Sequence, residues 1–186
     1  MILLCLAWAL QKNITNLNKQ KMKLTDYIAQ HIIDVHEGEN WTEVTIKDVL
    51  TDVNYKEAIT VTNASPNTIA SMLYHVSFYN DVIKQRLAGI NPSINSANGF
   101  DMPPITNEEQ WQQLKQRNLE SARQVADAAK NFPEEKLFDV TVTGHSTHYR
   151  NLHGIAEHAH YHLGQMGLLK NLIRKNNEKS ITRNSL

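Results

Sequence analysis

The stretch SPNTIASMLYHVSFYNDVIKQRLAG, residues 65–89, has a helical pattern with a marked beginning and end. Ser65 is a favoured N-cap residue, and Pro66 suits the first helical position because the N–H that proline lacks needs no partner there. Gly89 suits the position after the last turn. The apolar residues recur at intervals of three and four: Ile69, Met72, Leu73, Val76, Tyr79, Val82, Ile83 and Leu87. We predict a helix over Pro66–Ala88 with one buried face.

Three other segments repeat this spacing, and we predict helices over Leu24–Glu37, Asn107–Asn131 and His148–Lys175. Gly38 suits the C-cap of the first of them. Thr106 and Glu109 form a capping-box pair at the start of the second, and Pro133 follows its end. Four amphipathic helices without long strand patterns predict an all-α fold, a four-helix bundle with long crossover loops.

The connecting segments are less regular. We interpret Thr42–Val53 as an irregular crossing segment, and Gly89–Ile105, rich in Asn, Ser and Pro, as a loop. The alternation of apolar and polar residues in Phe138–His145 fits either a short strand or an extended loop. We expect one domain over residues 22–176 and a polar tail over residues 177–186.

The first residues differ in character from the rest. Met1–Leu10 is apolar, but no Lys or Arg precedes it and no A-x-A-like cleavage site closes it. Its length is about half of the ~20 residues that a membrane span requires, and no other segment comes closer. We interpret residues 1–21 as a disordered extension, with Met22 as an alternative start, and expect no membrane partner.

The charge balance restricts the class of partner. The chain has 19 Lys plus Arg and 19 Asp plus Glu, so it has no basic field for nucleic acid. Cys5 is the single cysteine, which excludes an internal disulfide framework and fits a reducing compartment. We expect a cytoplasmic protein that acts on a small-molecule substrate and not on nucleic acid.

Three of the nine histidines are candidate metal ligands. His158 and His162 are one helical turn apart on the same face, so both imidazoles can converge on one ion. His75 lies at the centre of the apolar stripe of the 65–89 segment and is the natural third ligand. Histidines four residues apart also arise by chance, so a purely structural bundle stays an alternative.

The pattern differs from other metal motifs. Ala159 stands where the zinc-protease motif H-E-x-x-H has glutamate, so no general base accompanies the pair. Glu157 directly precedes His158, so the Glu-x-x-His spacing of di-iron bundles is absent. Three histidines leave a coordination position open, as in catalytic sites; zinc suits such a site best, with nickel or iron as alternatives.

Other polar residues near the histidine pair are secondary candidates. Asn151 and Gln165 share its face and are candidates to orient a ligand or a bound water. His160 points to the opposite side, where we expect it to be exposed or packed against another element. His145 and His148, at a loop–helix junction, fit either a pocket mouth or solvated surface.

These residues resemble a known family. His153–Gln165, HGIAEHAHYHLGQ, is similar to the C-terminal helix motif of the DinB/YfiT-like superfamily of metal-dependent proteins. Ile69–Tyr79, IASMLYHVSFY, resembles its apolar helix with one central histidine. The segment HEGENWTEVTIKDVL, residues 36–50, also resembles members of the group. The likeness extends from about Met22 to Lys175.

The resemblance implies a four-helix bundle that holds a metal on His75, His158 and His162, and it implies homodimerisation. Relatives include thiol-dependent transferases and isomerases that use bacillithiol or mycothiol, which makes a low-molecular-weight thiol a candidate cofactor. The chain departs from the family at Leu163, where many relatives carry arginine.

Two functions are consistent with these residues. The first is a metal-dependent enzyme, a thiol S-transferase or hydrolase that acts on a small electrophile. The second is a non-catalytic protein that binds a metal or a small stress metabolite in the same pocket. The sequence predicts metal ligands for both and assigns no general base.

Overall fold

A computed structural model describes residues 22–184 of the chain and the side chains of residues 22–178. It contains α2 (Leu24–His36), α3 (Ile46–Leu50), α4 (Tyr55–Ala58), α5 (Ile69–Leu87), α6 (Glu108–Lys130), the 3-10 turn η1 (Glu134–Lys136) and α7 (His148–Asn184). Residues 22–184 form no strand, only two isolated bridges. The predicted all-α class is confirmed, whereas the interpretation of residues 1–21 falls outside the described residues.

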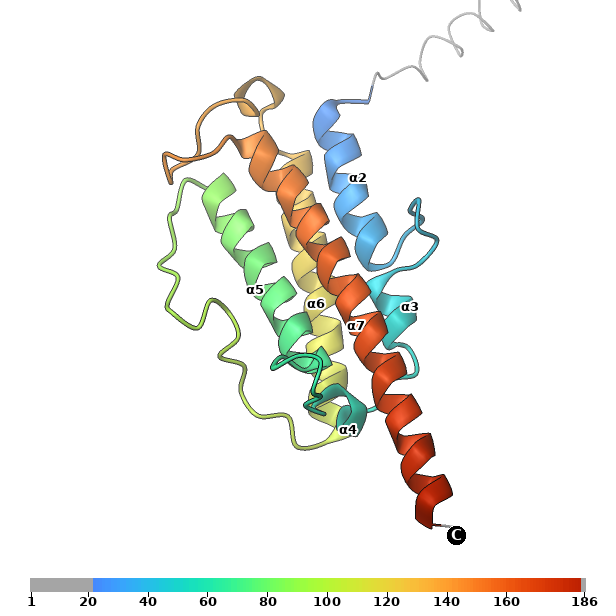
Figure 1. The fold of residues 1–186 in the computed structure, drawn as a ribbon. Coiled ribbons are helices and arrows are strands. Elements are labelled where there is room, and N and C mark those ends of the chain that lie inside the picture. Colours follow the sequence, from blue (N-terminus) through green and yellow to red (C-terminus); the bar gives the residue numbers. More distant parts are fainter. Residues whose placement is uncertain (1–21, 185–186) are drawn as a thin grey trace, which may run out of the picture.

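The four long helices α2, α5, α6 and α7 lie side by side with roughly aligned axes (Figure 1). Helix α5 runs antiparallel to α7, its neighbour, and parallel to α6 (Figure 1). Because α5 and α6 are parallel, the loop of residues 88–107 returns along the length of α5 to reach the start of α6. This long crossover brings its residues close to the middle of α5.

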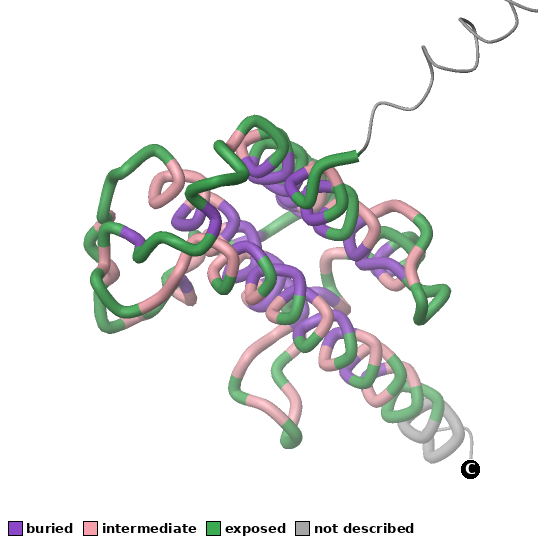
Figure 2. Tube along the Cα trace, turned by 90° about the horizontal axis from the view of Figure 1, so that it is seen from above, coloured by how far each residue is buried: buried purple, intermediate pink, exposed green. Residues whose placement is uncertain are grey.

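The core lies between these four helices, and buried positions follow their inward sides (Figure 2). Ile32 of α2, Leu73 of α5, Trp111 of α6 and Met166 of α7 have no exposed surface. Burying one such side chain contributes about 1.5–3 kcal/mol. Trp111 Nε1 also donates a hydrogen bond to the carbonyl oxygen of Val53 at 2.7 Å, which ties the α3–α4 segment to α6.

Two of the predicted helix starts are displaced in the structure. Helix α5 begins at Ile69 and not at Pro66, because Thr68 is the N-cap and its hydroxyl accepts from the Ser71 N–H at 3.1 Å. In α6 the N-cap is Asn107, one residue after the predicted Thr106. In both cases a side-chain oxygen closer to the apolar stripe accepts from one of the free N–H groups of the first turn.

The predicted ends of α2, α5 and α6 lie within one residue of the observed ends, whereas α7 continues past its predicted end. Gly89 follows α5 with a φ of 77°, the left-handed conformation expected of it. Gly38 does not take this conformation; it lies so close to Asp34 that a Cβ would overlap that residue. The predicted polar tail after residue 176 is helical to Asn184, because neither Gly nor Pro interrupts a helix already nucleated by its packed part.

The connecting segments take different forms. Thr42–Val53, expected to be irregular, contains the short helix α3, capped by Thr45. Phe138–His145, expected to be a short strand or an extended loop, is instead a series of turns with one bridge between Val140 and Thr147. None of the helices within the described residues has the length and apolarity needed to cross a membrane.

Candidate metal centre

The structure brings His75, His158 and His162 together between α5 and α7. His158 Nε2 lies 3.0 Å from His75 Nε2 and 3.1 Å from His162 Nε2. One ring nitrogen from each residue falls within 4.8 Å of those of the other two. Nitrogen ligands about 2.05 Å from a tetrahedral zinc ion are separated by about 3.3 Å, so the two nitrogen pairs that include His158 are close to the separation of metal ligands.

The outer nitrogens of two of these rings are held by oxygen acceptors. His75 Nδ1 donates to the carbonyl oxygen of Asn98, and His162 Nδ1 donates to Gln165 Oε1, each at 2.8 Å. A neutral imidazole carries one proton, so a proton on Nδ1 leaves Nε2 as a bare lone pair. Both lone pairs point toward the centre of the cluster. Such outer hydrogen bonds orient the histidine ligands of metal sites.

His158 completes the cluster, but its ring cannot donate a hydrogen bond to both neighbouring nitrogens at once. Its Nε2 faces two bare nitrogens, while its Nδ1 is buried and has no hydrogen-bond partner within the described part of the chain. One proton on His158 Nε2 can bond well to only one neighbour. The cluster therefore lacks a positive centre, and a metal ion is the group whose chemistry fits three converging imidazole nitrogens.

Burial keeps the three imidazoles neutral. The pKa of His158 falls to about 3, first because burial penalises the charged ring and then because His162 and His75 repel a second positive charge. Burial is also the main cause that lowers the pKa values of His75 and His162. Neutral imidazole is the form that binds metal, so the lone pairs are available at neutral pH.

A turn in the 88–107 loop supports His75, and sequence reasoning missed it. Asn98 and Gly99 both have left-handed backbone conformations, with φ values of 53° and 76°. This turn directs the Asn98 carbonyl to His75 and stacks Phe100 on the imidazole, with ring centroids 4.0 Å apart at 13°. Tyr79 donates its hydroxyl proton to Asn98 Oδ1. The available signal was the Asn-Gly pair, a strong turn former within the loop.

The cluster forms part of the wall of a cavity of about 530 Å³ between α5 and α7. Asn151, predicted to assist the ligands, lines this cavity but bonds to Arg86 Nη1 at 3.3 Å and to the Thr147 carbonyl. Arg86 and Arg150 also line it, and neither was predicted. The signal for Arg86 was its position eleven residues after His75, three turns along the same face of the helix.

The remaining histidines lie outside this cavity. His160 packs against α2, with its ring 5.8 Å from that of His31, and its Nδ1 donates to the Ala156 carbonyl. His145 is exposed, and His148 packs against the ring of Phe132. Neither His145 nor His148 lines the cavity of the three histidines.

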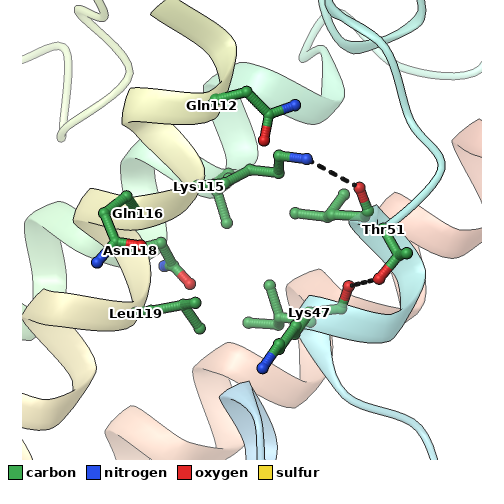
Figure 3. A pocket seen from close by; sticks show the side chains of 10 residues that line it. Lys47, Thr51, Gln112, Lys115, Gln116, Asn118 and Leu119 are labelled. Carbon is green, nitrogen blue, oxygen red and sulfur yellow. Dashed lines mark hydrogen bonds between the residues drawn. The ribbon is translucent and has the colours of Figure 1, made fainter. Parts of the chain in front are cut away.

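A second cavity, of about 290 Å³, lies between α3 and α6 (Figure 3). Its wall is largely apolar, and Lys115 Nζ at its edge donates to the Leu50 carbonyl at 3.4 Å. The apolar lining comes from Ile46, Leu50, Leu73 and Leu119. Because none of the described lining residues is a histidine or carboxylate, this cavity offers no metal ligands, and the histidine cavity is the better candidate site.

No family model, no curated protein and no solved structure matches the chain. What is known of the site is therefore the arrangement of its own residues, and membership of the DinB/YfiT-like superfamily stays a prediction. Metal binding by His75, His158 and His162 stays a prediction as well.

Proposed function

We propose that this chain is a four-helix bundle of the DinB/YfiT-like kind that holds one divalent metal ion on His75, His158 and His162. The observation that carries the proposal is the meeting of three Nε2 atoms, two of them bare because their rings donate through Nδ1. Because His158 Nε2 carries at most one proton for the two bare nitrogens, at least one of them has no donor unless a cation occupies the centre.

Zinc is the metal that these donors suit best. It binds imidazole nitrogen in tetrahedral sites, and three protein ligands leave a fourth position open to the cavity. Nickel and iron also bind imidazole and remain alternatives. The ring of Phe100 covers one face of His75, which restricts the access of water from that side.

The proposed activity is that of a metal-dependent thiol S-transferase or hydrolase acting on a small electrophile. The metal would supply a Lewis acid that lowers the pKa of a thiol or water entering the open position. Asn98 and Gln165 hold the imidazoles in the correct tautomer, and the cavity of about 530 Å³ has room for a substrate of modest size.

One observation favours a second candidate, a protein that binds a metal or metabolite without turnover. Among the described residues that line the cavity there is no Asp or Glu. A reaction that requires a carboxylate as general base would lack it here. A screen of thiols and electrophiles separates the two candidates, because only the enzyme gives turnover that disappears in the ligand variants.

The metal content of the purified chain tests the proposal. Elemental analysis should find about one divalent ion per chain, and each of His75→Ala, His158→Ala and His162→Ala should lose most of it. His160→Ala is the matched control, because His160 lies on the same helix but faces α2. Equal metal loss in His160→Ala and His158→Ala, or full retention in His75→Ala, would show that the ligands are wrongly assigned.

Thermal melting provides a second readout on the same proteins. A ligand that binds only the folded state at a hundred times its Kd stabilises that state by about 2.7 kcal/mol. Chelation should therefore lower the Tm of the wild type and of His160→Ala, and should leave the Tm of the three ligand variants unchanged.

A further inference from the structure

We propose that Arg86 binds the carboxylate of a small organic anion in the cavity between α5 and α7. The ligand would extend from Arg86 to the histidine cluster, so the proposal names a substrate class for the proposed function. It rests on that function only for the end of the ligand that reaches the histidines. The anion site itself rests on Arg86 and its surroundings.

The charge of the cavity wall is the first observation. Arg86 and Arg150 both line the cavity, and no Asp or Glu does so among the described residues. Neither arginine has a carboxylate partner within the described part of the chain, although Arg117, Arg123 and Arg174 all do. A cavity that carries two guanidinium groups without acidic neighbours attracts anions and disfavours cations.

The unused donors of Arg86 are the second observation. Its side chain makes one hydrogen bond, from Nη1 to Asn151 Oδ1 at 3.3 Å. Its Nε is buried and has no acceptor in the described part of the chain. A guanidinium has five N–H donors in a planar fork, and a carboxylate accepts two of them in parallel. Because protein atoms enclose Nε, the remaining N–H groups of Nη1 and Nη2 are the ones that would bind a carboxylate, which the protein itself does not provide.

Asn151 holds this guanidinium on the cavity side. Its Nδ2 donates to the Thr147 carbonyl at 3.1 Å, which leaves Oδ1 facing Arg86. An amide oxygen restrains the guanidinium without neutralising its charge, whereas a carboxylate partner would cancel the attraction for an anion. Arg86 is thus pre-positioned while its charge stays available.

The position of Arg86 relative to the histidines sets the length of the ligand. Asn151 precedes His158 by seven residues on α7, which is about 10 Å along the helix axis. Because α5 runs antiparallel to α7, the end of α5 that carries Arg86 lies beside the start of α7, and both helices then lead to the cluster (Figure 1). A ligand with its carboxylate on Arg86 and its reactive group at the histidine cluster spans the cavity.

Binding of simple anions to the metal-free chain tests the anion site. In NMR titrations of the chelator-treated protein, hexanoate should bind at least tenfold more tightly than 1-hexanol. This difference should disappear in Arg86→Gln and be reduced in Arg86→Lys, which keeps the charge but loses the fork. Arg117→Gln is the matched control, because Arg117 pairs with Asp81 and does not line the cavity.

Several outcomes would overturn the proposal. They are equal affinity of the wild type for hexanoate and 1-hexanol, an unchanged affinity for hexanoate in Arg86→Gln, or an equal loss in Arg117→Gln. Tighter binding of hexyl phosphate than of hexanoate would overturn the carboxylate assignment. The comparison of hexanoate with 1-hexanol needs only the wild type. It therefore tests for the anion site even if Arg86→Gln does not fold.

A second titration separates this proposal from the metal proposal. With zinc-loaded protein, 6-mercaptohexanoate should bind more tightly than hexanoate, and His158→Ala should remove that advantage. If the chain holds no metal but hexanoate binding still requires Arg86, the anion site stands and the metal assignment is wrong. If the metal is bound but Arg86→Gln changes no affinity, the anion site is wrong.

Discussion

Lowering the pH from 7 to 4 should destabilise the fold through His36, which lies outside the metal cavity. His36 is 1% exposed at the end of α2. Its Nδ1 donates to the Ile32 carbonyl at 2.9 Å, so in the neutral ring Nε2 is bare. The nearest partner of Nε2 is Asn80 Nδ2 at 3.5 Å, an amide nitrogen that also donates to Ser121 Oγ. A proton added at Nε2 would meet donors.

The size of the effect follows from the pKa of His36. Burial lowers it from 6.5 to about 4, although the Ile32 carbonyl and the Glu37 carboxylate oppose the change. Between these values the unfolded chain binds a proton that the folded chain excludes, so the free energy of unfolding falls as the pH falls. The full loss, at about 1.4 kcal/mol for each pH unit, is about 3 kcal/mol near pH 4. Well above pH 6.5 His36 is neutral in both the folded and the unfolded chain, so it adds no pH dependence to the free energy of unfolding.

Urea unfolding between pH 7 and pH 4 measures this difference. The comparison is between wild type and His36→Asn, with chelator present so that metal binding does not contribute. The substitution His36→Asn changes the free energy of unfolding at every pH. Below pH 6.5, however, this free energy should fall less steeply for His36→Asn than for the wild type. The difference between the two proteins should therefore change by about 3 kcal/mol between pH 7 and pH 4. His145→Asn is the control for the change of side chain, since His145 is exposed. Parallel curves for wild type and His36→Asn would refute the reasoning.

Two substitutions test the packing around the site and the core. Gly99→Ala should cost more free energy of unfolding than Gly89→Ala, because both have left-handed φ values but only at Gly99 would a Cβ overlap a neighbour, the Phe78 ring. Urea unfolding of the two variants gives the comparison, and equal costs would show that the loop adapts. Trp111→Phe should lose about 1–3 kcal/mol in the same assay, because the buried Val53 carbonyl loses its donor; a loss near zero would mean that another donor replaces the indole.

The helices were predictable because their signals are local. Apolar spacing fixed the existence and type of all four long helices, since a face that repeats every 3.6 residues must be buried. Exact boundaries depended on competition between nearby signals. Pro66 suits a first turn, but Thr68 is the N-cap because its hydroxyl accepts a hydrogen bond from the Ser71 N–H beside the apolar stripe. The extent of α7 was missed because polar composition was taken for a helix end, although composition alone does not break a helix.

The site was predictable only where its residues share a helix. His158 and His162 are one turn apart, so helical geometry alone brings them to one face. His75 was inferred as the missing third ligand, and its meeting with His158 depends on the packing of α5 against α7. The Asn98 carbonyl lies 23 residues from His75, in a loop whose path follows from the crossover between parallel helices. The course of such a loop cannot be predicted from the periodicity of the sequence.

Helix α5 shows why buried polar residues alone do not mark a site. Ser77 and Asn80 face α6, where Asn118 and Ser121 of that helix bond to them. His75 faces α7 from the opposite side of the same helix. Toward α6 each contact joins a donor to an acceptor within the protein, although Asn80 Oδ1 and Asn118 Oδ1 have no partner in the described part of the chain. Toward α7 two bare nitrogens meet at His158 Nε2, whose single proton can bond to only one of them, and the proposed cation would bind all three. The α6-facing side chains are fully buried and His158 is half-buried, so burial does not mark the candidate site; the convergence of three ring nitrogens does.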